Sequence, residues 1–167
     1  NSALLFYNRG NLAAGEQKLD DAITYWLKGI AVNPSYASNY YALAKQWEQS
    51  NPMWSLLYAE TFIHLEPYTK RTAEMKSIFL KAYKNYLGQG TNTLPSLKKS
   101  KQTTISNFVQ VFQQLHDNNI SAISNGITTE TLTMLRTRIV IDWRYHYHQT
   151  LPFTLLSYHD KLLKEGL

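Results

Sequence analysis

The sequence predicts an all-α protein in which antiparallel helix pairs repeat along the chain and a helical C-terminal extension follows. Apolar residues recur at helical spacing through most of the 167 residues, and two of the helical stretches run into a proline. The first third of the chain also repeats itself, since Pro34 and Pro67 are 33 residues apart and Phe6 and Tyr40 are 34 residues apart. A period of about 34 residues is typical of arrays of paired helices.

Each repeated unit carries a similar alternation of small and large residues over two helices. The first unit has Phe6, Arg9, Gly10 and Ala13 on its first helix, and Ala22, Ile23, Trp26, Gly29 and Ile30 on its second. The second unit has Tyr40, Leu43, Ala44 and Trp47, followed by Ser55, Leu56, Ala59, Phe62 and Ile63. Small residues allow two helices to approach closely, and the aromatic residues fill the space between neighbouring helices. We expect helix crossings at Gly10, Ala22, Ala44 and Ser55.

Prolines mark the ends of these helices. The residue before a proline disfavours the helical backbone, so Asn33-Pro34 and Glu66-Pro67 should end the second helix of each unit. Asn51-Pro52 predicts a helix start, with the asparagine as N-cap and the proline in the first turn.

These positions resemble the tetratricopeptide repeat family, and the resemblance covers about residues 3–68, or two repeats. Three residues depart from the family pattern: Arg9 replaces the usual Leu, Ala13 a large aromatic residue, and Gly29 the usual Ala. The resemblance implies a concave surface, lined by the first helix of each pair, that binds a peptide. The residues that it places on this surface are Tyr7, Asn8, Asn11, Tyr41, Lys45, Glu48 and Gln49.

Amide and phenol side chains on such a surface would hydrogen-bond an extended peptide backbone, and Lys45 would attract a carboxylate. The subclass of the family that binds chaperone tails uses a clamp of Lys, Asn, Asn, Lys and Arg. Asn11 fits this clamp, but Tyr7 stands where the first Lys would be and Ala42 where the second Asn would be. The resemblance therefore implies a peptide site other than a carboxylate clamp. The alternative is that these residues only face solvent or pack on the C-terminal extension.

The rest of the chain predicts further helices without a clear repeat. Residues 69–87 should form a long helix, the first of a degenerate third repeat, so that the repeats span residues 1–87. A loop over residues 88–102 follows. Residues 103–167 should form a C-terminal helical cap or extension, because a repeat array needs polar caps at its ends.

Within the extension, residues 103–116 predict an amphipathic helix that Asn118-Asn119 should end, and residues 121–127 predict a loop. A final helix should begin near Thr129. Pro152 should interrupt it and begin a shorter helix that runs to about Lys164.

The net charge of +5 is compatible with an acidic partner or a nucleic acid. Lys98, Lys99 and Lys101 form a tight basic cluster, best interpreted as solvated side chains of the predicted loop. The alternative function is nucleic-acid binding through this loop and a C-terminal helix that bears Arg136, Arg138 and Arg144. Core and docking contacts explain most of the nearby aromatic residues, which are Trp143, Tyr145, Tyr147, Phe153 and Tyr158.

No residue pattern indicates catalysis or a cofactor. The chain has no cysteine, which excludes disulfides, thiolate nucleophiles and Cys-ligated zinc, and it has no phosphate-binding glycine loop or nucleophile elbow. Candidate metal ligands are Asp142, His146, His148 and His159, but their spacing matches no recognised metal-binding motif. The acidic cluster of Glu16, Asp20 and Asp21 complements a helix dipole. We therefore expect neither an enzyme nor a cofactor or metal site.

These observations predict a non-enzymatic scaffold that binds a protein or peptide partner through the concave surface. No apolar run approaches the roughly 20 residues of a membrane-spanning helix. The weakly charged composition, rich in Asn, Thr and Tyr, favours an exported or periplasmic protein over a cytoplasmic one, and we expect a bacterial source.

Overall fold

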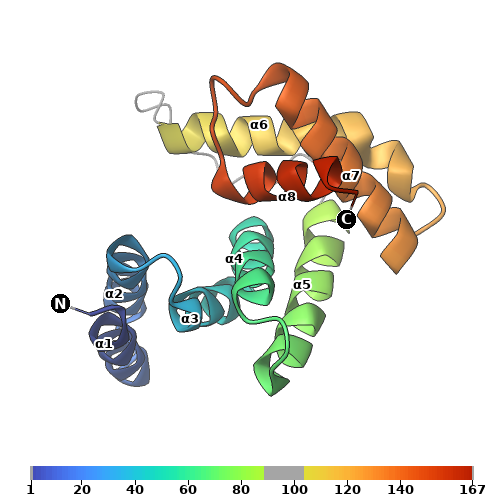
Figure 1. The fold of residues 1–167 in the computed structure, drawn as a ribbon. Coiled ribbons are helices and arrows are strands. Elements are labelled where there is room, and N and C mark those ends of the chain that lie inside the picture. The colour runs from blue at the N-terminus through green and yellow to red at the C-terminus, as the bar shows by residue number, and fades with distance from the viewer. Residues whose placement is uncertain (1, 89–103, 167) are drawn as a thin grey trace. The chain divides into compact units, whose positions relative to one another are not determined.

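The computed structural model describes residues 2–88 and 104–166, and every regular element within them is helical. The chain divides into two compact units, Asn1–Gln89 and Gly90–Leu167. The first unit contains α1 (Ala3–Gly15), α2 (Leu19–Val32), α3 (Ala37–Trp47), α4 (Pro52–Leu65) and α5 (Lys70–Gly88) (Figure 1). The second contains α6 (Thr104–Asn119), the 3-10 helix η1 (Ile120–Ile123), α7 (Thr129–His146) and α8 (Thr154–Lys164). The all-α prediction is confirmed.

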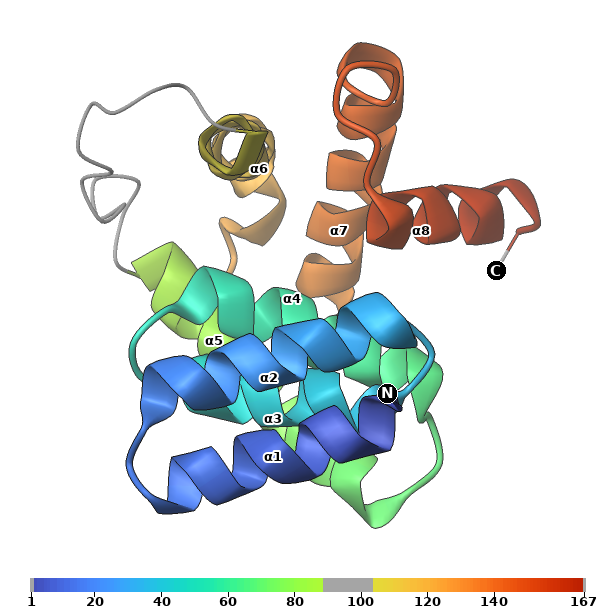
Figure 2. The same cartoon turned by 90° about the vertical axis from the view of Figure 1, so that its left-hand side faces the viewer.

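Consecutive helices of the first unit pack against each other in pairs. Contacts join α1 to α2, α2 to α3, α3 to α4 and α4 to α5, and further contacts join α1 to α3 and α3 to α5. Figure 2 shows α1, α2 and α3 lying side by side. The first helices of successive pairs are therefore neighbours, as in an all-α helical repeat.

The predicted helix boundaries of this unit are confirmed. α2 ends at Val32 and α4 at Leu65, each directly before an Asn-Pro or Glu-Pro pair. α4 begins at Pro52, and the side chain of Asn51 accepts a hydrogen bond from the backbone N–H of Trp54. Asn51 thus satisfies one of the N–H groups that the first turn leaves without a helical partner.

Small residues lie where the helices approach most closely. A Cβ on Gly10 would lie 2.2 Å from Nε1 of Trp26, so the indole of α2 packs directly on the backbone of α1. In the next pair, Oγ of Ser55 donates a hydrogen bond of 2.8 Å to the carbonyl oxygen of Ala44. Ala22 is fully buried. These contacts agree with the predicted crossings.

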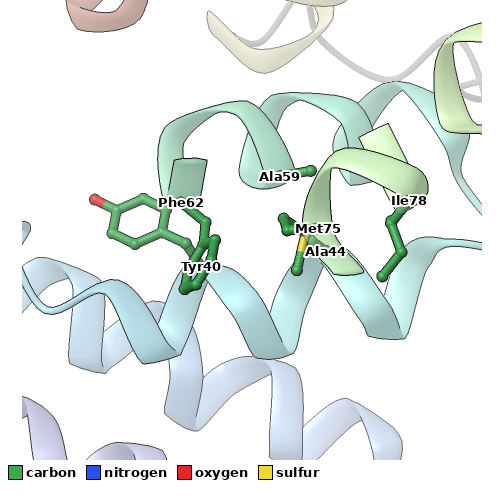
Figure 3. Packing of buried hydrophobic residues seen from close by; sticks show 6 residues of the cluster. All are labelled: Tyr40, Ala44, Ala59, Phe62, Met75 and Ile78. Atoms are coloured by element: carbon green, nitrogen blue, oxygen red, sulfur yellow. The ribbon is translucent and has the colours of Figure 1, made fainter. Parts of the chain in front are cut away.

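Buried clusters pack the described helices of the first unit together. One draws on α3, α4 and α5 (Figure 3) and consists of Tyr40, Ala44, Ala59, Phe62, Met75 and Ile78. The other joins the first helix pair to α3 and consists of Ala13, Ala22, Trp26 and Leu43. Trp26 and Tyr40 are buried as predicted, whereas Phe6 and Trp47 remain partly exposed.

Polar contacts between α3 and α5 reveal the register of the array. Arg71 donates to Ser38, Tyr41 donates to Glu74, and each pair is separated by 33 residues. Lys81 and Glu48 form an ion pair at the same separation. Equivalent positions of successive first helices therefore face each other. α5 thus has the position of the first helix of the next pair after α3 and α4.

The first helix of the second unit ends where Asn118-Asn119 predicts, since α6 runs to Asn119. The predicted loop of residues 121–127 differs from the structure, because its first residues belong to the 3-10 helix Ile120–Ile123. The turn that follows uses Gly126 with φ of +100°, a conformation that favours glycine. α7 begins at Thr129 as predicted, because Thr128 and Thr131 form a capping box.

α7 ends at His146, well before Pro152, so the proline neither interrupts this helix nor begins the next one. The backbone N–H groups of Tyr147 and His148 both donate to the carbonyl oxygen of Trp143, which closes the helix in a tight turn. Nε1 of Trp143 then donates 2.9 Å to the carbonyl oxygen of Leu151. The buried indole thus holds the connection to α8.

Candidate functional site

The seven residues predicted to line a peptide surface all belong to the first unit. Tyr7, Asn8 and Asn11 lie on α1, and Tyr41 and Lys45 lie on α3. The other two lie beyond the end of α3, since Glu48 is its C-cap residue and Gln49 follows in the turn. We refer to the polar surface of the first helices as the A-helix face; its members are Tyr7, Asn8, Asn11, Ser38, Tyr41, Lys45, Glu48, Arg71, Glu74 and Lys81.

The centre of the A-helix face is a three-residue network between α3 and α5. Nζ of Lys45 lies 2.7 Å from Oε1 of Glu74 and 3.3 Å from the hydroxyl oxygen of Tyr41, and that hydroxyl donates to Oε2 of Glu74. The hydrogen bonds from Lys45 and Tyr41 lower the pKa of the Glu74 carboxyl. The hydrogen bond to Glu74 likewise raises the pKa of Lys45. Both groups are therefore held in their charged forms.

Arg71 of α5 extends this network. Its guanidinium lies 5.2 Å from the ring centroid of Tyr41 and pairs with Glu66. The hydrogen bond that Arg71 donates to Glu66 is the main cause that raises the pKa of Arg71, with smaller contributions from the phenols of Tyr7 and Tyr41. The ring of Tyr41 thus lies beside the guanidinium of α5, and α3 is in turn in contact with α1.

The charges on the α3 and α5 part of the face cancel. Lys45 pairs with Glu74, Lys81 with Glu48, and Arg71 with Glu66. The sequence suggested that Lys45 would attract a partner's carboxylate; in the structure its ammonium already has one. These pairs are partly exposed, so each contributes little stability, but together they leave no unbalanced charge.

The α1 part of the face is neutral. The ring of Tyr7 packs edge-on against Tyr36, with 6.1 Å between the ring centroids. Asn8 and Asn11 are exposed. This end of the face offers amide and phenol groups that can donate and accept hydrogen bonds.

Sequence reasoning missed the contribution of α5. Arg71, Glu74 and Lys81 each lie 33 residues after a polar residue of α3 or its C-cap, namely Ser38, Tyr41 and Glu48. Projecting the α3 positions forward by one repeat would have identified them. The degenerate pattern of residues 69–87 hid this relation, because it shares the apolar spacing of the repeats but few of their marker residues.

The histidines of the second unit have separate surroundings. Nδ1 of His146 lies 2.8 Å from Oδ1 of Asp142, and Asn119 donates to Oδ2 of the same carboxylate. The ring of His148 packs on Trp143, while His159 lies 3.2 Å from the guanidinium of Arg136. Within the described part of the second unit, Asp142, His146 and His159 do not form a three-ligand group.

The acidic residues before α2 have structural surroundings. Glu16 forms an ion pair of 2.8 Å with Lys18. Asp20 and Asp21 occupy the first turn of α2, where negative charge stabilises the helix dipole. Their positions agree with the structural explanation offered by the sequence.

The arginines of the alternative nucleic-acid surface contact separate partners in the described residues of the second unit. Arg144 pairs with Asp160 at 3.0 Å, Arg136 faces His159, and Arg138 contacts Ser121. Among the aromatic residues, Trp143 is buried and Phe153 packs against Phe108 with 4.9 Å between centroids. Tyr145 and Tyr158 are exposed. Lys98, Lys99 and Lys101 lie outside the described residues, as does most of the predicted loop of residues 88–102.

A comparison of the chain with protein-family models, curated proteins and solved structures finds no significant match. Among the described helices, none combines the length and the apolar character needed to cross a membrane.

Proposed function

We propose that the first unit is a tetratricopeptide-type scaffold that binds a protein or peptide partner, without catalysis, through the A-helix face. The observation that carries this proposal is the row of hydrogen-bonding and aromatic side chains on three successive first helices, in which α1 contacts α3 and α3 contacts α5. Successive helices in register present a continuous row of such groups, which suits an extended chain with its regularly spaced backbone donors and acceptors.

The cancelled charges suggest which interactions supply the affinity. Lys45 and Lys81 already have carboxylate partners within the face, and Arg71 has one in Glu66 at the end of α4. A partner's carboxylate would have to displace one of these, so attraction between net charges contributes little. Hydrogen bonds to Asn8 and Asn11, and contact with the ring of Tyr7, fit a neutral polar segment better.

We expect binding to resist salt. Raising the salt concentration from about 50 to 500 mM should change the dissociation constant by less than about threefold, because screening weakens attraction between net charges and leaves neutral hydrogen bonds largely intact. A titration at several salt concentrations measures this. A fall in affinity by two orders of magnitude would instead indicate a charge-driven partner such as a nucleic acid.

The partner can be sought by capture from a lysate of the source organism. The test variant carries Asn8→Arg and Asn11→Arg, two changes at exposed positions of α1 that block the neutral end of the face. The control carries Thr24→Arg and Ala31→Arg on α2, which are also exposed and add the same charge. A partner retained by the wild type and control, and lost by the test variant, supports the proposal. A partner retained equally by all three refutes this site.

A further inference from the structure

Two tyrosines and two asparagines lie together at the neutral end of the A-helix face. The ring of Tyr7 on α1 meets the ring of Tyr36, the N-cap residue of α3, edge-on, and the two ring planes are inclined at 71°. Both rings are partly exposed, and Asn8 and Asn11 are exposed. Asn11 lies one helical turn after both Tyr7 and Asn8, so it neighbours each of them on the surface of α1. We call these four residues the tyrosine–amide patch.

The surroundings of the patch argue against several ways of holding a peptide. Every regular element among the described residues of the first unit is helical, so these residues offer no sheet edge to an added strand. An amphipathic helix docks in an apolar groove, but Asn8 and Asn11 put two polar amides on this surface. A phosphorylated or acidic segment needs unpaired cations, and those of the A-helix face already pair with carboxylates. The patch therefore suits a neutral segment in an extended conformation.

We propose that the tyrosine–amide patch binds a proline-rich segment of the partner protein in the polyproline II conformation. This ligand class rests on the proposed function, since the patch lies at the α1 end of the A-helix face. A polyproline II segment makes no hydrogen bonds within itself, so its carbonyl oxygens are available to a binding surface. Surfaces lined by aromatic residues recognise such segments because the rigid conformation is formed before binding.

The chemistry of the patch matches that of proline. A proline residue has a carbonyl acceptor but no N–H, so a proline-rich segment requires mainly donors from its binding surface. The two amides and the two phenol hydroxyls of the patch can supply these donors. The inclined rings of Tyr7 and Tyr36 offer apolar surface on which a pyrrolidine ring can pack. An extended segment without proline would bring further N–H groups that need acceptors, so proline is favoured over other neutral residues.

The test is a titration of the full chain with a blocked oligoproline peptide of about ten residues, which forms a polyproline II helix in water. The chemical shifts of the backbone amides in NMR spectra report both the dissociation constant and the location of binding. A blocked peptide of the same length made of glycine and serine is the control ligand, because it is neutral but flexible. The oligoproline should shift the amides around Tyr7 and Tyr36, and the control peptide should not.

Variants of the chain locate the contact. Tyr7→Ala should raise the dissociation constant for oligoproline at least about tenfold, equivalent to about 1.4 kcal/mol, because the ring supplies packing surface. Asn11→Ala should raise it about threefold through the loss of one donor. Because Asn11 is exposed, this second variant keeps the test decisive if Tyr7→Ala does not fold. Tyr68→Ala is the matched control and should leave the affinity unchanged, since Tyr68 is 97% exposed in the turn before α5.

Three results would overturn the proposal: oligoproline shifts no amides around the patch, the glycine–serine peptide binds equally well, or Tyr7→Ala and Asn11→Ala bind oligoproline as tightly as the wild type. The proposed function is judged separately by the captured partner. A partner that is lost with Asn8→Arg and Asn11→Arg, but that oligoproline does not displace, retains the A-helix face as the site and rejects proline as its ligand. A partner unaffected by those two changes rejects the A-helix face itself.

Discussion

Replacing Gly10 with alanine is expected to destabilise the chain by about 2 kcal/mol or more. The new Cβ would lie 2.2 Å from Nε1 and 2.5 Å from Cδ1 of Trp26. The indole is only 4% exposed and packs among buried residues, so it cannot move aside without disturbing the first helix pair. The sign of the effect is informative, because glycine to alanine inside a helix ordinarily stabilises by about 1 kcal/mol.

Gly15→Ala is the matched control. Gly15 lies at the end of the same helix, and a Cβ there meets nothing within 4 Å. Chemical denaturation of both variants should give a lower free energy of unfolding for Gly10→Ala and an unchanged or higher one for Gly15→Ala. If Gly10→Ala is as stable as Gly15→Ala, the close packing of Trp26 on α1 is incorrect.

The second large effect is expected on acidification. His116 on α6 is buried, its ring packs at a tilt against Phe112, and its Nδ1 lies 2.8 Å from the Phe112 carbonyl oxygen. Burial lowers the pKa of His116 from its ordinary 6.5 to about 4. Between these values the unfolded chain binds a proton that the folded chain does not, so the free energy of unfolding falls as the pH drops. The free energy of unfolding should be lower by about 3 kcal/mol near pH 4 because of this histidine. This decrease should disappear above pH 6.5.

Other groups also titrate in this range, so the control is the variant His116→Gln. The glutamine amide neither takes up nor releases a proton between pH 4 and 7. The carboxylates with lowered pKa values, including those of Glu66 and Glu74, remain in both proteins. The difference between the two unfolding curves against pH isolates the histidine. Parallel curves would show that His116 is accessible to protons in the folded chain.

Much of the first unit could be predicted from local chemistry. The Asn51-Pro52 start and the ends at Asn33 and Glu66 depend on rules that act within a few residues, and the structure follows them. The crossings at Gly10 and Ala44 were predictable because close packing needs small residues at regular intervals. Local propensity and the repeat period agree here, so the pattern predicts the helices well.

The remaining features depend on contacts between distant residues. The end of α7 at His146 is held by the hydrogen bond from Trp143 to Leu151, which no helix rule foresees. The pairing of Lys45 with Glu74 was missed because residues 69–87 were recognised from their apolar spacing alone, and the polar positions of α3 were not projected onto them. Assigning Lys45 to a partner's carboxylate failed for the same reason, since the sequence showed its charge but not its neighbour.

Contact of a partner with the A-helix face is best tested by hydrogen–deuterium exchange of the full chain with and without the captured partner. We expect slower exchange in α1, α3 and α5, centred on the segments around Asn11, Tyr41 and Glu74. The variant with Asn8→Arg and Asn11→Arg should lose this protection, whereas the variant with Thr24→Arg and Ala31→Arg should keep it. Protection confined to α2 and α4, or to α6, α7 and α8, would contradict the claim.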